Sequence, residues 1–282
     1  MKTAIKKADI LVEAIPYIKK FRGKCVVIKY GGSALEDKKT RLGILEDIVF
    51  MSYIGIKPVF IHGGGPSITD RLKKEGVCSR FVDGYRVTDK DTLKVVDSVL
   101  KELNLKIGKE IEAIGAMPAH YSPSSGLIKA VRHNARGGIG FVGDVSSVDI
   151  PMLNKALRMG LIPVIYPVGK GRNGGLFNIN ADEVAYKVAS SIKAEKLMVL
   201  TNVKGIMLDN KKGAFISTLS AKRAEGLMDR GVINSGMIPK VSSCIKALKG
   251  GVKKAHIISG HVKHALLLEI FTDKGIGTEI VR

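Results

Sequence analysis

The sequence is short of the residues that mark several classes of protein. It has no tryptophan, and its three cysteines, Cys25, Cys78 and Cys244, lie far apart with no CxxC pair. This odd, scattered set argues against a disulfide framework or a zinc knuckle and favours a reducing compartment. No apolar run approaches the roughly 20 residues that span a bilayer, and Glu13 and Pro16 interrupt the short apolar segment near the amino terminus. We therefore expect a cytoplasmic protein without a membrane partner.

Acidic residues are also scarce relative to basic ones. The chain has 46 Lys and Arg against 26 Asp and Glu, which gives a formal charge of +20. Such an excess can attract nucleic-acid phosphates through counterion release. The basic residues, however, are spread along the chain singly or in pairs, and the aromatic residues form no ladder on which bases could stack. We expect solvated faces that attract anionic metabolites, and no nucleic-acid partner.

Helix and strand patterns alternate along most of the chain. Short apolar runs predict buried strands at 25–29, 58–62, 162–165, 196–202 and 255–259. Amphipathic spacing and capping residues predict helices at 4–21, 40–53, 66–75, 89–113, from about 180, and at 220–230, 238–249 and 261–271. Residues 115–150 are punctuated by Gly and Pro and are expected to form hairpins or an extension at a sheet edge. The alternation predicts an α/β fold, a three-layer sandwich with an open, mainly parallel central sheet.

The same pattern divides the chain into an amino-terminal helix and two lobes. Apolar residues within 4–21 recur at three- and four-residue spacing, which predicts an amphipathic helix bent or ended near Pro16. This helix precedes the first strand, so its apolar stripe requires a cover. We assign residues 1–23 to this extension, residues 24–190 to one lobe and residues 191–282 to the other.

Two glycine turns follow predicted strands and suit the binding of a phosphoryl group. They are KYGGS at 29–33 and HGGGP at 62–66. Glycines at the end of a strand let main-chain N–H groups approach an anion, and Pro66 suits the first turn of a helix whose dipole favours negative charge. Ligands of open parallel sheets bind at the carboxyl ends of strands, and a buried lysine needs an anionic partner. We therefore interpret Lys29 as a phosphate ligand; the alternative is a lysine that extends to solvent at the sheet edge.

Two familiar nucleotide signatures do not apply. The chain has no GxxxxGK[ST] segment, which excludes a P-loop enzyme. Residues 138–143 do spell GxGxxG, but strand-like residues follow them, no helix opens there, and no acidic residue follows at the distance that a ribose requires. We interpret this match as accidental.

Several other polar residues stand where they could bind ligands. NINAD at 178–182 places two amides and a carboxylate at a helix start, where capping alone would also explain them. In GYRVTD, Arg86 could bind a carboxylate through its fork of donors. Lys240 lies just inside a helix start, opposes the helix dipole and so requires an anion. His261 and His264 lack a third metal ligand, and we expect them on a solvated helix face.

Taken together, five spaced motifs resemble those of the amino acid kinase family. They are KYGGS (29–33), HGGGP (62–66), GYRVTD (84–89), NINAD (178–182) and GMIPK (236–240). The resemblance covers essentially the whole chain. Within the family it is strongest to the members that phosphorylate N-acetyl-L-glutamate in arginine biosynthesis. It implies transfer of a phosphoryl group from ATP to the γ-carboxylate, with Mg²⁺ held mainly by the nucleotide phosphates and no metal site of the protein itself.

The resemblance implies a role for each matching position. Lys29 and Lys240 would stabilise the transferring phosphoryl group, and Asp182 would hold both lysines in place. Main-chain N–H groups of Gly32 and Gly64 would cradle the same group. The substrate contacts would be Gly64, Gly65, Arg86 and Asn178. The nucleotide contacts would be Asn202, Val203, Gly205, Met207, Val232 and Asn234. The lobe 24–190 would bind acetylglutamate and dimerise, and the lobe 191–282 would bind the nucleotide.

Two further segments resemble the arginine-inhibited members of this family. They are the EAIPY bend at 13–17 and the stretch HALLLEIFTDKGIGT at 264–278. In that subgroup the amino-terminal helices of neighbouring dimers interlace into a hexameric ring, and an apolar stripe suits such an interface. The resemblance implies a hexamer, a trimer of dimers, inhibited by L-arginine. Its contacts with the inhibitor would include Lys196, Glu269 and Gly277.

The chain also departs from the family pattern. Asn202 stands where the family more often has Asp, Ser235 replaces a common glycine, and residues 119–126 lack the usual glycine-lysine-aspartate turn. Other members of the family remain alternatives, among them kinases for uridylate, carbamate, aspartate, glutamate and carrier-linked aminoadipate. A non-catalytic regulator that binds anions or nucleic acid is the alternative from a different class.

Overall fold

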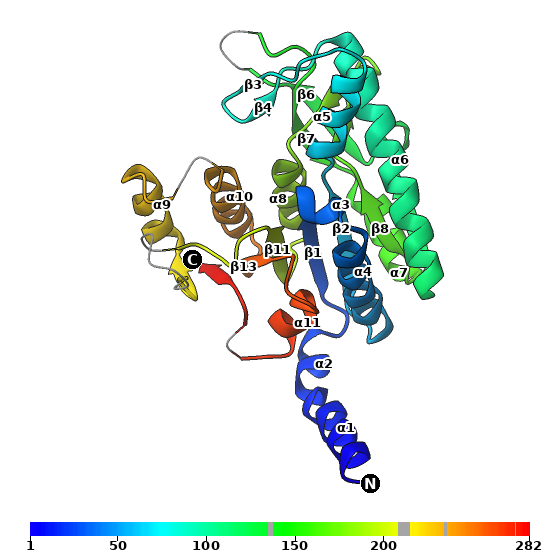
Figure 1. Ribbon diagram of the computed structural model, residues 1–282, viewed down its shortest axis with the longest axis vertical. Helices are drawn as coiled ribbons and strands as arrows, with labels where there is room; N and C mark the ends of the chain where they lie inside the picture. Colours follow the sequence, from blue (N-terminus) through cyan, green and yellow to red (C-terminus); the bar gives the residue numbers. More distant parts are fainter. Residues whose placement is uncertain (135–137, 208–214, 234–235, 274) are drawn as a thin grey trace.

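The computed structural model describes all residues except 135–137, 208–214, 234–235 and 274 (Figure 1). Its central sheet contains β1 (Cys25–Tyr30), β2 (Lys57–His62), β5 (Pro118–Tyr121), β8 (Ile162–Ile165), β11 (Lys196–Thr201), β12 (Thr218–Ser220), β13 (Lys254–Ser259) and β14 (Thr278–Val281). Across the sheet the order is β12-β14-β13-β11-β1-β2-β8-β5. β14 pairs antiparallel with β13 and parallel with β12, so these two edge strands oppose the others. The mainly parallel α/β fold is confirmed.

Helices cover both faces of this sheet. The helices of the described residues are α1 (Lys2–Glu13), α2 (Ile15–Phe21), α3 (Ser33–Glu36), α4 (Lys38–Tyr53), α5 (Gly65–Lys74), α6 (Lys90–Ile114), α7 (Ile150–Arg158), α8 (Ala181–Ser191), α9 (Ala221–Asp229), α10 (Ile238–Lys249) and α11 (Ala265–Ile270), of which α1 lies away from the sheet. Successive strand residues point to opposite faces. Val27 and Val59 therefore pack with α8 and α10, whereas Ile28 and Phe60 pack with α4, α6 and α11. These two buried clusters form the core.

The parallel register brings the two glycine turns to the same edge of the sheet. Lys29 lies opposite Ile61 of β2 and opposite Val199 of β11. The Gly63 N–H then donates to the Tyr30 carbonyl oxygen at 2.8 Å, directly after the paired strands. The structure thus places the ends of β1 and β2 side by side, as the sequence predicted.

Smaller sheets extend the region beyond this edge. One contains β6 (Ile128–Arg132), β7 (Gly143–Val148), β9 (Val168–Lys170) and β10 (Leu176–Asn178), and a hairpin joins β3 (Phe81–Val82) to β4 (Tyr85–Arg86). In Figure 1 this hairpin overhangs the upper end of the molecule beside α5. The hairpin predicted within 115–150 is confirmed for β6 and β7. β5 forms the predicted extension, since it is the edge strand of the central sheet, next to β8.

The amino-terminal segment forms two helices that meet at Ala14, two residues before Pro16. Helix α1 projects away from the body at the bottom of Figure 1, whereas α2 packs on the body through Tyr17 and Phe21. Ile10, Leu11 and Val12 of α1 are each more than 60% exposed, so the apolar stripe faces solvent in the single chain.

The prediction for the two histidines near the carboxyl terminus is wrong. Helix α11 begins only at Ala265, so His261 and His264 precede it and share no helix face. His264 has a left-handed φ of 56°, and its Nδ1 lies 2.8 Å from Oδ1 of the fully buried Asp47. The other oxygen of Asp47 accepts the Leu266 N–H at 3.2 Å. A carboxylate on α4 therefore caps α11, and this distant contact sets where the helix begins.

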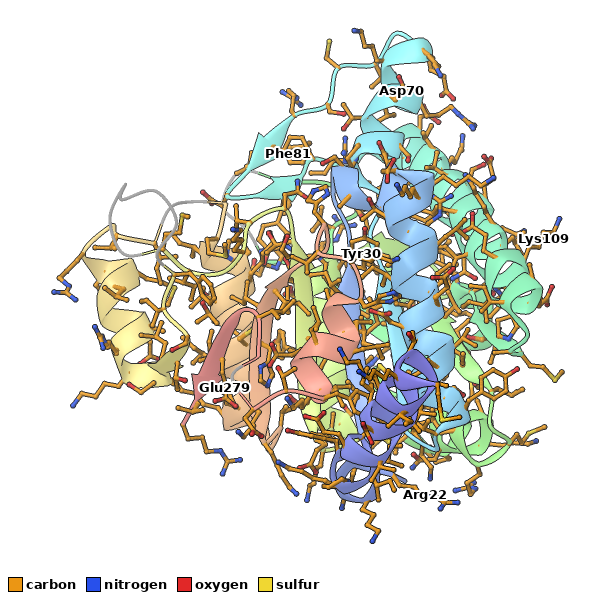
Figure 2. All side chains as sticks on the ribbon, turned by 60° about the horizontal axis from the view of Figure 1, so that its bottom comes forward. Arg22, Tyr30, Asp70, Phe81, Lys109 and Glu279 are labelled. Atoms are coloured by element: carbon orange, nitrogen blue, oxygen red, sulfur yellow. The ribbon has the colours of Figure 1, made fainter. Side chains whose placement is uncertain are left out.

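Charged side chains surround the molecule and do not gather at one place. Figure 2 shows nitrogen-tipped side chains around the outline, including Lys109, which points outward from α6. Within the described residues, no helix is long and apolar enough to cross a membrane.

Candidate active site

An ion pair joins the end of β1 to the start of α8. Lys29 lies on the face covered by α8, and its Nζ is 2.9 Å from Oδ1 of Asp182. Both residues are buried, at 7% and 5% exposure. Asn180 fixes the helix start because its Oδ1 accepts the Asp182 N–H at 2.8 Å. Lys29 therefore does not extend to solvent at the sheet edge, since its charge is buried against a carboxylate.

Lys240 belongs to the same electrostatic environment. It is the third residue of α10 and half-buried, and its Nζ donates to the Gly236 carbonyl oxygen at 3.2 Å. Burial lowers the pKa of Lys240; the charge of Asp182 opposes this shift and the charge of Lys29 adds to it. The structure thus brings together the two lysines and the carboxylate that the sequence singled out. Because Asp182 is paired with Lys29 while the charge of Lys240 lies in the same environment, the group has an affinity for a further anion.

The glycine turns beside this group bring the main chain close to Lys29, and at Gly64 a side chain would have no room. A Cβ on Gly31 would lie 3.5 Å from both the Gly63 Cα and the Lys29 Nζ. A Cβ on Gly64 would lie 2.7 Å from Leu100. Gly32 has a φ of 82°, a conformation that favours glycine. The backbone of both turns therefore approaches the Lys29 ammonium closely.

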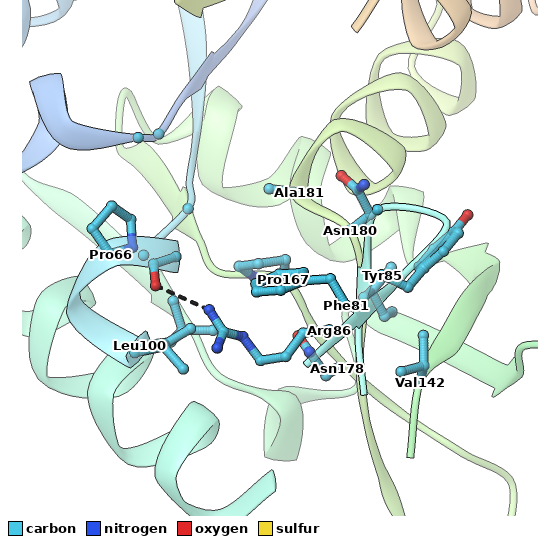
Figure 3. A pocket seen from close by; sticks show the side chains of 18 of the residues that line it. Pro66, Phe81, Tyr85, Arg86, Leu100, Val142, Pro167, Asn178, Asn180 and Ala181 are labelled. Atoms are coloured by element: carbon cyan, nitrogen blue, oxygen red, sulfur yellow. Dashed lines mark hydrogen bonds between the residues drawn. The ribbon is translucent and has the colours of Figure 1, made fainter. Parts of the chain in front are cut away.

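A cavity of about 240 Å³ opens next to the glycine turns (Figure 3). Its lining includes Gly63, Gly64 and Gly65 from the second turn, with Arg86 and Asn178. Figure 3 shows Arg86 reaching toward Pro66 and Leu100, and a dashed line marks its bond to the Gly65 carbonyl. The predicted substrate contacts are thus brought together.

The side chain of Arg86 is held in place by several neighbouring residues. Arg86 Nη2 donates to the Gly65 carbonyl at 3.0 Å and to Thr69 Oγ1 at 2.9 Å, and its Nη1 donates to Ser79. The guanidinium carbon lies 4.8 Å from the centre of the Phe81 ring, and burial lowers the pKa of Arg86. These three partners are neutral oxygens, so they do not neutralise the positive charge of the guanidinium. That charge can therefore attract a carboxylate ligand.

The GxGxxG segment at 138–143 has a structural task that the sequence did not reveal. As predicted, it leads into strand β7 and opens no helix. The Thr88 N–H donates to the Ile139 carbonyl at 3.0 Å, and the Phe141 N–H donates to the Thr88 carbonyl at 2.6 Å. The Asn178 N–H donates to the Phe141 carbonyl at 2.9 Å, and its side-chain Nδ2 donates to Thr88 Oγ1 at 3.1 Å. The segment therefore ties the GYRVTD turn to Asn178.

A half-buried acidic pair next to Asp182, Glu183 and Asp144, was also missed. Glu183 Oε1 accepts the Val145 N–H at 2.8 Å, and burial raises the pKa of Glu183 to about 7, with a further contribution from Asp144. Asp144 Oδ1 lies 2.6 Å from His133 Nδ1, and the His133 ring lies 4.4 Å from that of Tyr85. These contacts link α8 to the β3–β4 hairpin. They join residues far apart in the chain, so no local pattern announces them.

A second cavity, of about 550 Å³, lies beside β11 and α10. The predicted nucleotide residues in its lining are Val203, Gly205, Met207 and Val232. Asn202 points instead toward the first glycine turn, where its Nδ2 donates to Ser33 Oγ at 3.0 Å. Asn234 and Ser235 lie outside the described residues.

A third cavity, of about 170 Å³, lies at the opposite edge of the central sheet. Its lining includes all three predicted effector residues, Lys196, Glu269 and Gly277, together with residues of helix α2. The carboxylates that line it are Glu195, Glu269, Asp273 and Glu279. Burial lowers the pKa of Lys196. Burial alone would raise the pKa of Glu269. The pKa is nevertheless lowered, because the His256 ring lies 2.7 Å from the carboxylate.

Known proteins resemble this chain over nearly its full length. The model of the amino acid kinase family matches residues 24–259. An acetylglutamate kinase from Caldanaerobacter subterraneus subsp. tengcongensis is 49% identical over 279 residues, which cover 98% of this chain and 93% of the relative.

Solved structures also match. The N-acetylglutamate synthase of Neisseria gonorrhoeae, in complex with coenzyme A and N-acetyl-glutamate, superposes with a TM-score of 0.88 at 29% identity, covering 98% of this chain. The chain spans only 63% of that synthase. The same synthase with coenzyme A and L-arginine gives a TM-score of 0.84 at 28% identity, covering 97% of this chain and 65% of the synthase.

Proposed function

Because the chain belongs to the amino acid kinase family, we infer that it phosphorylates the γ-carboxylate of N-acetyl-L-glutamate with ATP, a step of arginine biosynthesis. One observation carries this function from the geometry: Lys29, Asp182 and Lys240 share an electrostatic environment at the strand ends, beside a cavity with a buried arginine. A γ-carboxylate has an ordinary pKa near 4.3, so it is ionised at neutral pH and needs no general base. The task of the protein is to bring two anions together.

We propose that Lys29 and Lys240 stabilise the phosphoryl group during transfer and that Asp182 holds the two ammonium groups apart. The phosphoryl oxygens carry spread negative charge in transit, so cations and N–H groups aimed at them lower the barrier. The N–H groups of Gly32 and Gly64 serve as further donors. Mg²⁺ enters with ATP and is held mainly by its phosphates, since Asp182, the carboxylate of this group, is already paired with Lys29.

Acetylglutamate occupies the cavity of about 240 Å³ in this proposal. Arg86 and Asn178 bind its α-carboxylate, and Gly64 and Gly65 contact it through the main chain. The acetyl group has a chemical purpose, because a free amine would attack its own acyl phosphate and cyclise. The cavity is therefore expected to reject free glutamate.

The nucleotide occupies the cavity of about 550 Å³, which Val203, Gly205, Met207 and Val232 line. Asn202 and Asn234 complete this proposed site. The lobe 24–190 then carries the acceptor and the lobe 191–282 the donor, and transfer takes place where the two meet.

Regulation by L-arginine is part of the same proposal. The third cavity suits a guanidinium because four carboxylates line it, with Lys196, Glu269 and Gly277 as contacts. A related synthase has been solved with L-arginine. The exposed apolar stripe of α1 suits helix interlacing in a hexamer, a trimer of dimers, and we place the enzyme in the cytoplasm.

The decisive experiment traps the acyl phosphate with hydroxylamine. Purified protein, ATP and Mg²⁺ are incubated with acetylglutamate, glutamate, aspartate or uridylate in parallel. We expect hydroxamate from acetylglutamate and at least tenfold lower kcat/KM for glutamate, a discrimination in the range that one binding group supplies. Comparable kcat/KM for the two amino acids would contradict the assignment.

A further inference from the structure

A chain of hydrogen-bonded side chains leads from the second glycine turn through Asn104 of α6 to strand β5. The ring of His62, fully buried, lies with Nδ1 2.9 Å from the Gly63 carbonyl oxygen. Its Nε2 lies 3.1 Å from Asn104 Nδ2, and Asn104 Oδ1 lies 2.7 Å from His120 Nδ1. None of these side chains has a part in the reaction described above.

The Asn104 amide fixes the proton on His62. Asn104 Nδ2 also donates to the Val164 carbonyl at 3.1 Å, and a carbonyl can only accept, so the amide has one possible orientation. His62 Nε2 must then accept from this amide, and the ring proton lies on Nδ1. The Nδ1–H consequently donates to the Gly63 carbonyl. Burial lowers the pKa of His62 to about 4, which keeps the ring neutral at physiological pH.

The Gly63 carbonyl sets the direction of the next N–H group. The described chain has no cis peptide bond, so the C=O of Gly63 and the N–H of Gly64 point in opposite directions. His62 lies on the sheet face covered by α6, whereas Lys29 and Asp182 lie on the face covered by α8. A carbonyl held toward His62 therefore turns the Gly64 N–H toward Lys29. Among the described residues, none accepts a hydrogen bond from that N–H.

We propose that His62, with its proton fixed by Asn104, is a positioning residue that aims the Gly64 N–H at the transferring phosphoryl group. This inference rests on the proposed kinase function, in which that N–H cradles the phosphoryl group. A donor lowers the barrier only when it is aimed, before reaction, at the charge that develops. Glycine has no side chain to fix its own peptide plane, so a neighbour has to supply the constraint.

The surroundings of His62 allow it to keep this state. The titratable groups that face it are His120 across Asn104 and Tyr166, whose ring centre lies 6.2 Å away. Tyr166 is itself engaged, since its hydroxyl donates to Asp97 at 3.1 Å. His120 is partly exposed, and it can gain a proton on Nε2 while its Nδ1–H still donates to Asn104.

The test reverses the hydrogen bond to His62 and keeps the size of the side chain; it also removes the bond to the Val164 carbonyl, so thermal unfolding is measured beside kcat. In Asn104→Asp, a carboxylate accepts where the amide donated, so the proton moves to His62 Nε2 and Nδ1 faces the Gly63 carbonyl without a proton. We expect kcat to fall about tenfold or more, less than for outright loss of a donor, with both KM values within about threefold. A carboxylate also favours the imidazolium, which restores the Nδ1 donor, so kcat relative to wild type should recover as the pH is lowered toward 6. Nitrogen-15 chemical shifts of labelled histidine report the tautomer directly.

Three matched variants complete the experiment. His62→Asn places an amide nitrogen near the position of Nδ1 and should keep kcat within about threefold, whereas His62→Leu should lose as much as Asn104→Asp. Ile107 is buried on α6, the helix that carries Asn104. Ile107→Val therefore controls for loss of packing and should leave kcat within about twofold. Thermal unfolding confirms that each variant is folded.

The outcomes separate the two levels of the proposal. Wild type that forms acyl phosphate, with Asn104→Asp and His62→Leu near its kcat, would refute the positioning role and leave the kinase assignment intact. The same follows if both variants lose only stability, as Ile107→Val does. Wild type that forms no acyl phosphate from acetylglutamate would overturn the kinase assignment, and the positioning role with it.

Discussion

Two lysines on neighbouring strands of the central sheet are buried to the same extent and have different surroundings. Lys29 lies near the carboxyl end of β1 and Lys196 at the start of β11, and each is 7% exposed. Lys29 Nζ is 2.9 Å from Asp182, whereas Lys196 Nζ is 3.8 Å from Glu269. They also point to opposite faces, since Lys196 lies 5.4 Å from the ring of Phe21 on the face covered by α4.

The difference lies in what else the partner carboxylate binds. Glu269 Oε1 is 2.7 Å from His256 Nδ1, and its Oε2 accepts the Ile276 N–H at 3.0 Å. Asp182 has a second lysine, Lys240, in its electrostatic environment instead. An excess of cations at one edge of the sheet suits an anionic ligand, whereas the other edge carries carboxylates and lysines side by side, which suits a ligand with both a cationic and an anionic group. A buried pair of a lysine and a carboxylate can thus have a different proposed task at each end of the sheet, because the two ends of parallel strands have different chemical surroundings.

The largest effect is expected from removing the lysine at the carboxyl edge. Lys29→Met should reduce kcat about a hundredfold or more, because it removes a charge aimed at the phosphoryl group. Lys196→Met is the matched control and should keep the uninhibited kcat within about threefold. The acyl-phosphate assay measures both. Equal losses in the two variants would show that the two edges do not differ in function.

Lys240→Ala tests whether the second cation acts on the same group. We expect kcat to fall about a hundredfold while KM for acetylglutamate stays within about threefold, since the contribution arises in the transition state. Initial rates at varied acetylglutamate give both constants. Near-native turnover would remove Lys240 from the proposed mechanism.

Glu269→Gln probes the amino edge. A charged hydrogen bond contributes about 1.5–3 kcal/mol, so the half-inhibitory concentration of L-arginine should rise about tenfold or more while kcat without arginine changes little. Glu225→Gln, which removes a surface carboxylate paired with Lys249, is the control. If arginine inhibits the Glu269 variant and wild type alike, the third cavity is not the effector site.

Glu183→Gln should have the smallest effect, and it sharpens the contrast between adjacent carboxylates on α8. The folded state raises the pKa of Glu183 from 4.5 to about 7, so between these pH values the folded protein binds more protons than the unfolded chain. The free energy of unfolding therefore falls as the pH rises through this window. The side chain is partly exposed, so we discount the effect to about 1 kcal/mol, or about 2–4 °C in Tm.

Melting curves at pH 5 and pH 8 measure this difference for wild type and for Glu183→Gln, with the exposed Glu112→Gln as control. The decrease in Tm from pH 5 to pH 8 should be smaller in Glu183→Gln than in the other two proteins. Identical decreases in all three would show that Glu183 is not the titrating group.

Much of the fold could be predicted because its elements carry local signals. The apolar run at 25–29 became β1, and Asp89 caps α6, which ends at Ile114 against a predicted 113. β12 and β14 were not predicted, since three or four residues at a sheet edge depend on their partners and carry little pattern. The predicted start of α11 was wrong because the cap of this helix is distant in sequence. Asp47, which accepts the Leu266 N–H, lies 219 residues before it.

The candidate site could be predicted only in part for the same reason. Glycine turns and lysines stand next to strand and helix ends, so their edge of the sheet follows from the sequence. Their individual roles came from the resemblance to a family. The contacts of Asn104, Glu183 and Phe141 join distant segments, and nothing local distinguishes these residues from ordinary polar or core positions.

The position of β14 has a consequence for the order in which the chain can assemble on the ribosome. β14 pairs with β13 on one side and with β12 on the other, yet it is synthesised after both. β12 therefore has no strand partner in the sheet until residues 278–281 have emerged. Although folding during translation proceeds from the amino terminus, this edge of the sheet can close only afterwards, so a chain from which only residues 1–260 have emerged would expose the unpaired side of β13.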